Sequence, residues 1–466
     1  MEEPWDLVVL GAGPGGYSAA IRAAQLGFRT LCIDRREGPG GVCLHEGCIP
    51  SKALLESSRH FEILASGELA VHGIVTAPPA LDVAAMMRRK SEVTTSLSRG
   101  IETLFRKYKV HWLRGEARLR QPDLVSVVTT EGERTIPARR VLLAAGGQPA
   151  ELPELPVDGR RILSSRHALA LERVPDHLIV VGGGAIGLEL GSVWRRLGAR
   201  VTVVEGLPEI LPGWDEPLVR QAKRLFIKQG LNVLTGRRVL GWEADGEGIA
   251  LRLLGSDGEE RLVGSLVLAA AGRRPDPEAA GAAALGVERD GAGRIVVDKE
   301  YQTSLPGVYA VGDLIPGPML AHKAMEEGVI FAERLAGHDV KLNYGAIPYV
   351  IYTRPELASV GWTVSQAQAH GLPVKSGQFP FLANGRARAA GEADGMIRMA
   401  MEETTGHLVG VHMLGPHVSE LIAPAALAVA EGWTAAQLGE RPFAHPTLAE
   451  ALKEAALALA GKAIHA

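Results

Sequence analysis

The stretch Asp6-Leu-Val-Val-Leu-Gly-Ala-Gly-Pro-Gly-Gly16 decides the fold of this chain. An apolar run leads into Gly11-x-Gly13-x-x-Gly16, and a second apolar run ends at Asp34. Gly11 suits a tight turn, Gly13 lets the backbone approach a pyrophosphate, and Gly16 lets a helix pack closely on a strand. The helix after the turn offers free N–H groups to phosphate oxygens, and Asp34 can accept a hydrogen bond from a ribose hydroxyl. The stretch therefore predicts a strand–turn–helix unit that binds a dinucleotide.

The same plan recurs in the run His177-Leu-Ile-Val-Val-Gly-Gly-Gly-Ala-Ile-Gly187, which contains Gly182-x-Gly184-x-x-Gly187. In both copies an acid, Asp34 or Glu205, follows the first glycine by 23 residues. One glycine motif alone is weak evidence, and two unrelated glycine-rich turns are the alternative. The equal spacing favours two copies of one nucleotide-binding plan. A carboxylate at Glu205 suits a free 2′-hydroxyl and repels a 2′-phosphate, which favours NAD over NADP.

The arrangement of apolar runs and turns predicts an α/β protein with two Rossmann-like dinucleotide-binding domains and a C-terminal α+β domain. A Pro-rich connector over 148–159 indicates a domain boundary. Strand patterns alternate with alanine-rich helical patterns after about residue 342. The predicted domains are residues 1–147, completed by 273–341, for the first nucleotide; 148–272 for the second; and 342–466 for the last domain.

Composition excludes several classes of protein. The 466 residues carry a net charge of -3, whereas a nucleic-acid-binding protein usually has an excess of basic residues. The start at Met1 has no basic and apolar leader pattern, and no apolar run approaches the roughly 20 residues of a membrane span. With only three cysteines and no disulfide framework, we expect a cytoplasmic protein without a membrane partner.

Two of the cysteines lie in Gly40-Gly-Val-Cys43-Leu-His-Glu-Gly-Cys48-Ile-Pro-Ser-Lys52. We expect both near the start of one helix that continues through residues 53–61, where the helix dipole stabilises a thiolate. Such a pair suits reversible thiol–disulfide exchange. The alternatives are two unrelated buried thiols or a metal site. No metal is expected, because four ligands are wanted and no cysteine follows Cys48. Cys32 lies in a strand pattern and is interpreted as a core residue.

Near the C-terminus, the run His445-Pro-Thr-Leu-Ala-Glu450 contains a candidate base and a carboxylate. An imidazole suits proton transfer at neutral pH, and a carboxylate can orient it. Two plainer interpretations stand beside this one. Thr447-x-x-Glu450 matches a capping box, and His445 can be an ordinary loop residue. Lys52 and Glu189 can likewise be a solvated helix lysine and an acid in a helix's first turn.

Together these motifs resemble the flavin-dependent pyridine nucleotide–disulfide oxidoreductases over nearly the whole chain, most closely the members that oxidise dihydrolipoamide with NAD⁺. The resemblance rests on both glycine motifs, 41–52, Gly272-Arg-Arg-Pro275, Gly312-Asp313, 321–328 and 445–450. It implies that FAD is held by Gly11, Gly13, Gly16, Asp34, Gly41, Val42, Lys52, Gly115, Ala145, Gly146, Gly147, Asp313, Met319, Leu320, Ala321 and His322. It implies that NAD is held by Gly182, Gly184, Ile186, Gly187, Glu189, Glu205, Val239 and Gly272.

The resemblance also implies roles for the remaining candidates. Cys43 and Cys48 would form the redox-active disulfide, with Cys48 nearer the flavin. His445 would be the base and Glu450 its partner, both supplied by the second subunit of a homodimer, while Lys52 and Glu189 would pair beside the flavin. The lipoyl group would arrive on a lipoyl domain of an acyltransferase core, whose peripheral subunit-binding region would dock this chain. His45 departs from the family's usual Asn.

Other functions remain open from the sequence. A glutathione-reductase-like enzyme using NADPH wants basic residues where Glu205 stands. Relatives that reduce mercury, and thioredoxin reductases with C-terminal redox pairs, need further thiols after Cys48, and this chain has none. A flavin-bearing scaffold or redox sensor without turnover is the third alternative, against which the intact His445 and Glu450 argue.

Overall fold

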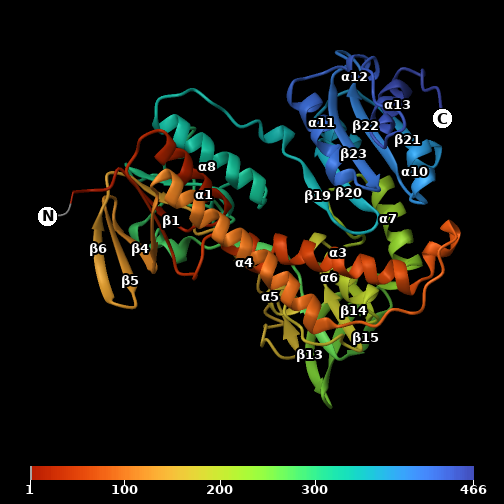
Figure 1. Cartoon of the computed structure of the whole chain (residues 1–466), viewed down its shortest axis with the longest axis horizontal. Helices are drawn as coiled ribbons and strands as arrows, with labels where there is room; N and C mark the ends of the chain where they lie inside the picture. The colour runs from red at the N-terminus through yellow and green to blue at the C-terminus, as the bar shows by residue number, and fades with distance from the viewer. Residues whose placement is uncertain (1–2, 466) are drawn as a thin grey trace.

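The computed structural model describes residues 3–465, so Met1 and Glu2, on which part of the leader argument rests, lie outside the described residues. The first nucleotide-binding unit lies around β1 and α1 in Figure 1. It is built on a five-stranded parallel sheet in the order β18-β7-β1-β2-β3. Its strands are β1 (Leu7–Leu10), β2 (Thr30–Asp34), β3 (His111–Arg114), β7 (Val141–Leu143) and β18 (Val308–Ala310). Every residue of β1, β2 and β7 is buried, because helices or strands cover both faces of a parallel sheet.

Helices and a small sheet complete this unit. Helices α1 and α8 pack against each other although they are about 300 residues apart. The helices are α1 (Pro14–Gln25), α2 (Gly41–Glu46), α3 (Cys48–Ala65), α4 (Val83–Tyr108) and α8 (Ala321–Leu335), with short 3-10 helices η1 (Glu68–His72), η2 (Pro277–Ala280), η3 (Ala283–Leu285) and η4 (Gly312–Leu314). A further 3-10 helix, η5 (Tyr344–Ala346), packs on the C-terminal domain. The antiparallel strands are β4 (Glu116–Gln121), β5 (Leu124–Thr129) and β6 (Gly132–Pro137).

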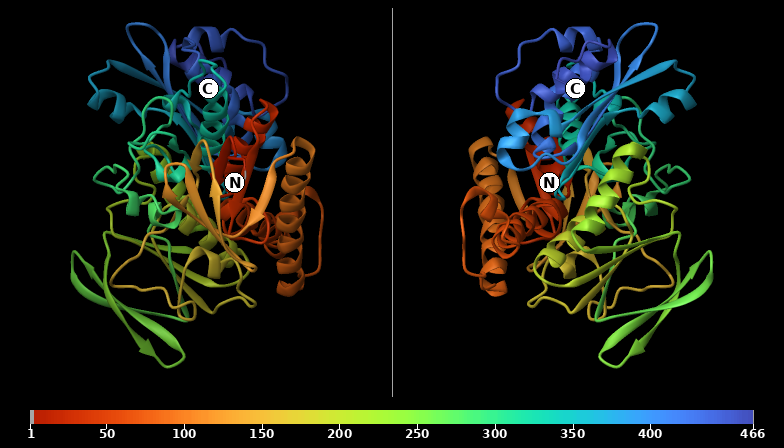
Figure 2. Two further views of the ribbon diagram at one scale, coloured as in Figure 1. Left: turned by 90° about the vertical axis from the view of Figure 1, so that its left-hand side faces the viewer. Right: turned by 90° about the vertical axis from the view of Figure 1, so that its right-hand side faces the viewer.

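The second unit repeats this plan with a parallel sheet in the order β12-β11-β10-β16-β9. Its elements are β9 (Ile162–Leu163), α5 (Ser165–Ala168), β10 (His177–Val181), α6 (Ala185–Arg196), β11 (Arg200–Glu205), α7 (Glu216–Lys228), β12 (Leu231–Thr235), β13 (Arg238–Asp245), β14 (Gly248–Gly255), β15 (Gly258–Gly264) and β16 (Leu266–Ala269). Strands β13–β15, green in Figure 2, lie at the end of the molecule farthest from the blue C-terminal domain. The chain enters and leaves this unit side by side, because β8 (Gly147–Pro149) pairs with β17 (Arg273–Pro275).

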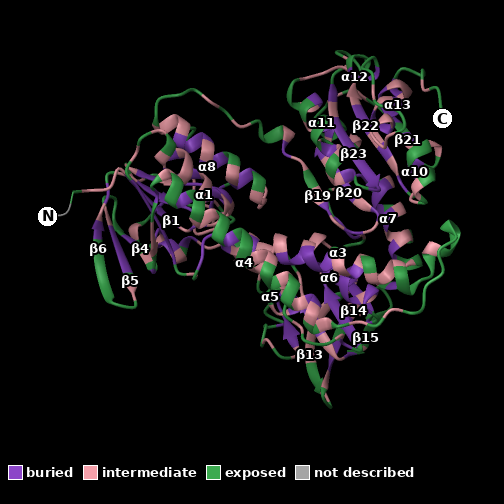
Figure 3. Cartoon of the chain, in the orientation of Figure 1, coloured by how far each residue is buried: buried purple, intermediate pink, exposed green. Residues whose placement is uncertain are grey.

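The C-terminal domain is a five-stranded antiparallel sheet in the order β19-β20-β23-β22-β21 with helices packed on it. Its elements are β19 (Tyr349–Ile351), β20 (Glu356–Gly361), α9 (Val364–Ala369), β21 (Val374–Pro380), η6 (Phe381–Ala383), α10 (Gly385–Ala390), β22 (Met396–Glu402), β23 (Leu408–Gly415), α11 (Val418–Ala430), α12 (Ala435–Gly439) and α13 (Glu450–Leu459). Figure 3 shows buried residues concentrated in its central strands.

The hydrophobic cores show how the parts meet. Leu54 and Leu55 of α3 belong to the same buried cluster as Leu188 and Trp194 of α6, although in the chain α3 lies between β2 and β3 of the first sheet. Helix α3 therefore packs on the second unit and joins the two dinucleotide units. The site lies where α3 begins, beside α6.

Candidate active site

Both glycine turns have the conformation that the sequence predicts. Gly11 has φ +108° and Gly182 has φ +114°, and a Cβ at either position would lie 2.4 Å from the carbonyl oxygen of the residue that follows the neighbouring strand, Ala144 or Ala270. A Cβ on Gly16 would lie 1.8 Å from the Gly11 carbonyl oxygen, and one on Gly187 would lie 2.1 Å from that of Gly182. Only glycine fits these positions, since the helix lies directly against the turn.

The two acids hold the turns that precede them. Asp34 accepts a hydrogen bond from the Ala12 N–H at 2.8 Å, and Glu205 accepts one from the Gly183 N–H at 2.7 Å. Both carboxylates thus bind the middle residue of their own Gly-x-Gly turn. The side chain of Asp34 is only 7% exposed, while Glu205 is half-buried. From the sequence, these two carboxylates were predicted to accept hydrogen bonds from ribose hydroxyls, and their bonds to the backbone were missed. The ribose contact stays a prediction.

A two-part cavity extends from the first turn to the cysteines. One part, of about 570 Å³, lies along Asp34 and Gly115; the other, of about 280 Å³, lies between the start of α1 and the starts of α3 and α6. The predicted cofactor residues that line it are Gly11, Gly13, Asp34, Gly41, Val42, Lys52, Gly115, Ala145, Gly146, Gly147, Ile186, Glu189, Asp313, Met319, Leu320 and Ala321.

The cavity fits FAD. Gly13, the residue before α1, gives that helix no side-chain cap, so the N–H groups of the first turn remain free for a pyrophosphate. A Cβ on Gly13 would have only Gly41 Cα within 4 Å, at 3.9 Å, whereas a Cβ on Gly41 would lie 2.5 Å from Gly13 Cα. The backbone therefore leaves a side-chain-free cradle at this point. The second unit offers the same feature, because Gly184, the residue before α6, gives that helix no side-chain cap.

Some predicted cofactor residues do not line this cavity. These are Gly16, His322, Gly182, Gly184, Gly187, Glu205, Val239 and Gly272. His322 is exposed, and its Nε2 lies 2.8 Å from the Pro348 carbonyl oxygen, so its side chain turns away from the cavity. The predicted FAD contact of His322 stays a prediction; it would fall to the backbone of this residue, which lies in the first turn of α8.

Arg273 is a residue of the cavity that sequence reasoning missed. Its Nε lies 3.6 Å from Asp313 Oδ2, and its guanidinium donates to the Gly147 carbonyl. Burial raises the pKa of Asp313, and the nearby charges of Arg273 and Lys323 partly oppose that shift. The available signal was the position of this arginine directly after Gly272, within the motif Gly272-Arg-Arg-Pro275.

The redox loop, residues 41–52, differs from the single helix that we expected. Helix α2 ends at Glu46, Gly47 interrupts the helical path with φ −143° and ψ −108°, and Cys48 opens α3. The prediction that both cysteines lie at the start of one helix is therefore wrong for Cys43, which belongs to α2. The helix breaks here because glycine, which has no Cβ, can adopt this non-helical backbone conformation at little steric cost. Both thiols are half-buried and free in this structure.

The two thiols have opposite proton affinities. The interaction between the two thiol groups lowers the pKa of Cys48 to about 7 against the effect of burial, and the charge of Lys52 lowers it further. The same interaction and burial raise the pKa of Cys43 far above its usual range. In the dithiol form Cys48 therefore loses its proton before Cys43 does.

Lys52 and Glu189 come together across the two units. Lys52 Nζ on α3 lies 2.8 Å and 3.1 Å from the two carboxylate oxygens of Glu189 on α6. The side chain of Glu189 is 7% exposed, so it is not a solvated surface acid. Both residues line the part of the cavity that contains Cys43 and Cys48. The charge of Lys52 favours the Cys48 thiolate, and the charge of Glu189 opposes it.

His445 and Glu450 form a pair on the surface of the C-terminal domain. His445 Nδ1 lies 2.9 Å from Glu450 Oε1, and the His445 side chain is 78% exposed. Glu450 Oε2 accepts the Thr447 N–H, but the Thr447 hydroxyl donates to the Ala444 carbonyl, so the full capping box does not form. Although burial opposes it, hydrogen bonds from Thr447 and His445 lower the pKa of Glu450. Neither residue lines the cysteine cavity of its own chain.

His45, where the family resemblance predicts Asn, lies on α2 between the cysteines. Its Nε2 is 3.2 Å from both the Gly38 and the Pro39 carbonyl oxygens. Ser98 of α4 donates to the same Pro39 carbonyl at 2.8 Å. His45 thus ties α2 to the loop that precedes it.

The comparisons with known proteins agree with this geometry. Residues 5–328 match the model of the pyridine nucleotide-disulphide oxidoreductases, and residues 347–456 match the dimerisation domain of the same family. The chain belongs to this family. It is 45% identical over 467 residues to dihydrolipoyl dehydrogenase 3 of Pseudomonas aeruginosa, covering all of both chains. It is 44% identical to the mitochondrial dihydrolipoyl dehydrogenase of Pisum sativum, covering 99% of this chain and 92% of that one.

A solved structure extends the likeness to three dimensions. The crystal structure of LpdA from Mycobacterium tuberculosis superposes with a TM-score of 0.88 at 28% identity, covering 97% of this chain and 98% of that one. Family membership confirms the predicted fold class, and it confirms an oxidoreductase that uses FAD and NAD. Among the described residues, no helix has the length and apolar character needed to cross a membrane.

Proposed function

We propose that this chain is a dihydrolipoyl dehydrogenase, which oxidises dihydrolipoamide with NAD⁺ through the Cys43–Cys48 pair. One observation carries the proposal: Cys43 and Cys48 line a single cavity with the Lys52–Glu189 ion pair, where the two dinucleotide units meet. The identity of 44–45% over nearly the full length of two dihydrolipoyl dehydrogenases supports this substrate.

The thiol chemistry follows from the two cysteines. A thiolate of dihydrolipoamide attacks Cys43 Sγ in the Cys43–Cys48 disulfide, a mixed disulfide forms, and Cys48 leaves as the thiolate that its low pKa favours. The second substrate sulfur then attacks the first, which closes the lipoamide ring and frees Cys43. Two electrons move from substrate to enzyme. Of the two protons released, His445 accepts one and Cys43 keeps the other.

The cofactors would be held by the residues already described. Asp34, Gly115 and the cradle at Gly13 and Gly41 would hold FAD, while the turn at Gly182–Gly187 and Glu205 would hold NAD. The chemistry that FAD would supply, when bound, is two-electron transfer between the dithiol and NAD⁺. The protein's part is to hold Cys48 as a thiolate, to place Lys52 beside it and to keep the two nucleotide sites adjacent.

We also propose that the active unit is a homodimer in which the partner subunit supplies His445 and Glu450. The match of 347–456 to a dimerisation domain supports this assembly. The high exposure of His445 leaves it free to enter a second chain's cavity. By resemblance, the lipoyl group would arrive on an acyltransferase core. The compartment would be the cytosol, where structural disulfides are rare and a disulfide is usually catalytic.

A paired assay tests the proposal. The holoenzyme is assayed with dihydrolipoamide and NAD⁺, and separately with glutathione disulfide and NADPH. We expect turnover only in the first, because Glu205 stands where a 2′-phosphate would need a cation. Turnover of glutathione disulfide by NADPH instead would contradict the proposed substrate. A protein that binds FAD but turns over neither pair would fit a scaffold or sensor and would also contradict it.

A further inference from the structure

Helices α3 and α6 are joined by ion pairs at two places. Lys52 pairs with Glu189 beside the cysteines, and further along the helices Glu62 Oε2 lies 3.3 Å from Arg196 Nε. The short segment Tyr352–Arg354, which follows β19 in the C-terminal domain, reaches both places. Helix α3, helix α6 and the segment Tyr352–Arg354 therefore meet at these two ion pairs.

Tyr352 contacts the first pair from two directions. Its backbone N–H donates to Glu189 Oε1 at 3.0 Å, and its ring centroid lies 4.3 Å from Lys52 Nζ. An ammonium at this distance over an aromatic face is attracted by the ring. Burial, neighbouring carboxylates and the Cys48 thiolate raise the pKa of Tyr352, so the ring stays a neutral phenol. Lys52 is thus held between a carboxylate and an aromatic face.

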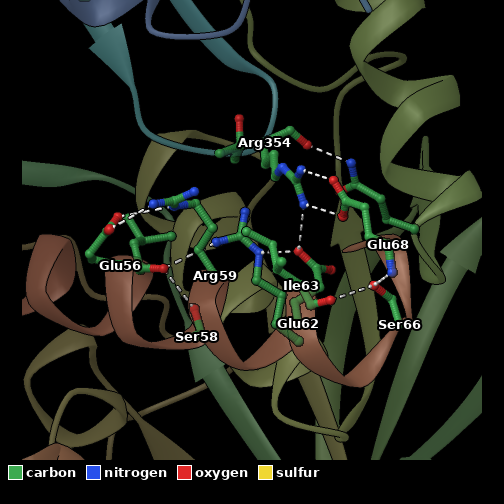
Figure 4. A network of polar contacts seen from close by, with 12 residues as sticks. Glu56, Ser58, Arg59, Glu62, Ile63, Ser66, Glu68 and Arg354 are labelled. Carbon is green, nitrogen blue, oxygen red and sulfur yellow. Dashed lines mark hydrogen bonds and ion pairs between the residues drawn. The ribbon is translucent and has the colours of Figure 1, made fainter. Parts of the chain in front are cut away.

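Arg354 fixes the same segment at the second place (Figure 4). Its guanidinium lies 2.9 Å from Glu68 Oε2, 2.8 Å from Glu392 Oε1 and 3.8 Å from Glu62 Oε2. The arginine side chain is 21% exposed, which keeps these pairs partly away from solvent screening. Arg354 anchors the segment to α3 and to the C-terminal domain, and so sets the position of Tyr352.

We propose that Tyr352 is a positioning residue for the redox site, whose ring and amide hold the Lys52–Glu189 pair so that the Lys52 ammonium stabilises the Cys48 thiolate. This inference rests on the proposed function. Its test, however, measures the ionisation of Cys48 and not turnover, so it can fail while dihydrolipoamide oxidation stands.

The balance of charges around Cys48 gives the sign of the effect. The groups that face it are the Cys43 thiol from α2, Lys52 from α3, Glu189 from α6 and Tyr352 after β19. Lys52 favours the thiolate and Glu189 opposes it. A lysine side chain has several rotatable bonds and loses its fixed position when one of its two attractions is removed. Without the aromatic face, the ammonium is held only toward Glu189, and the pKa of Cys48 rises.

The experiment uses FAD-loaded Cys43→Ser enzyme, which keeps a single thiol in the redox loop. A thiolate against FAD adds absorbance at long wavelength, and this absorbance is titrated against pH. We expect Tyr352→Leu to raise the midpoint by about one pH unit, which lowers the thiolate fraction near neutral pH roughly fivefold. Tyr352→Phe keeps the aromatic face and should keep the midpoint. The matched control is Tyr108→Leu, since Lys107 Nζ lies 5.0 Å from the Tyr108 ring at the end of α4.

Two results would overturn the proposal. One is a midpoint for Tyr352→Leu equal to that of the Cys43→Ser parent. The other is an equal shift in Tyr352→Phe, which would assign the effect to the hydroxyl and not to the ring. If Tyr352→Leu does not fold with FAD, Tyr352→Met fills the same space without an aromatic face, and its midpoint decides by the same criterion.

Discussion

The first and second dinucleotide units build the same turn and differ in the segments that come after it. In both, the first glycine takes a positive φ, the third lies against the carbonyl of the first, and an acid binds the middle N–H. After β2, however, the first unit inserts α2, α3 and α4 before it returns to its sheet. After β11 the second unit continues only with α7 and the strands of its sheets.

The shared turn accounts for dinucleotide binding, and the inserted helices of the first unit account for the proposed thiol chemistry. The shared turn explains why both units take a dinucleotide, since it depends on backbone geometry and one carboxylate. The insertion adds Cys43, Cys48 and Lys52, and its α3 packs against α6 of the second unit. Under the proposed function, the first unit would contribute the reacting thiols, and the second would contribute Glu189 and the place for NAD. Substitutions in each unit and in the C-terminal domain test this division.

The largest effect is expected at the redox loop. Cys48→Ser removes the thiolate that leaves the disulfide, so dihydrolipoamide oxidation should fall at least about a thousandfold while FAD stays bound. The matched control is Cys32→Ala, which removes a thiol buried in β2 of the same unit. That variant should keep its activity. Equal activity of Cys48→Ser and the wild type would show that the insertion does not carry the chemistry.

The next effect concerns the base that neither dinucleotide unit contains. His445→Gln should lower kcat roughly a hundred- to a thousandfold, because it removes the proton acceptor. Hybrid dimers of one Cys48→Ser chain and one His445→Gln chain should regain activity, since one of their two sites then has both groups. If both groups came from one chain, the hybrids would stay as inactive as their parents.

A smaller effect separates two glycines of the second turn. Gly187→Ala would place a Cβ 2.1 Å from a backbone carbonyl, so we expect it to lower the free energy of unfolding by about 3 kcal/mol. Gly184→Ala meets no atom within 4 Å and should unfold like the wild type while binding NAD more weakly. Denaturant titrations of both variants make the comparison. Equal stability of the two variants would contradict the account of the turn.

The smallest effect is expected at the acids. Glu205→Gln leaves one fewer acceptor for the Gly183 and Leu207 N–H groups, so the KM for NAD⁺ should rise about tenfold with kcat little changed. The matching Asp34→Asn should weaken FAD retention and leave the KM for NAD⁺ unaltered. A change in the KM for NAD⁺ with Asp34→Asn and not with Glu205→Gln would reverse the assignment of the two units.

Much of this comparison was predictable from the sequence, because it rests on local rules. The glycines and acids at equal spacing fix the turns, and the apolar runs before them fix buried parallel strands. The break at Gly47 was not predictable, since the run from Cys43 to Lys52 also suits one helix. The direction of the His322 side chain was not predictable either, because the start of α8 sets it.

Contacts between residues that are distant in the sequence could not be predicted from local sequence patterns. Lys52 and Glu189 were paired only through the family resemblance, and nothing in the sequence near either residue indicates Tyr352, which arrives from the C-terminal domain. Arg273 was visible beside Gly272, but its contact with Asp313 depends on the pairing of β8 with β17. Long-range packing of this kind needs coordinates.

Stoichiometric reduction of the FAD-loaded enzyme by dihydrolipoamide tests the central claim most directly. One equivalent of dihydrolipoamide should open the Cys43–Cys48 disulfide and produce the long-wavelength absorbance of a thiolate against FAD. This absorbance should grow with rising pH and reach half its maximum at pH about 7, because the thiolate forms above the pKa of Cys48. The same absorbance in Cys48→Ser, or bleaching of the FAD without it, would contradict the account.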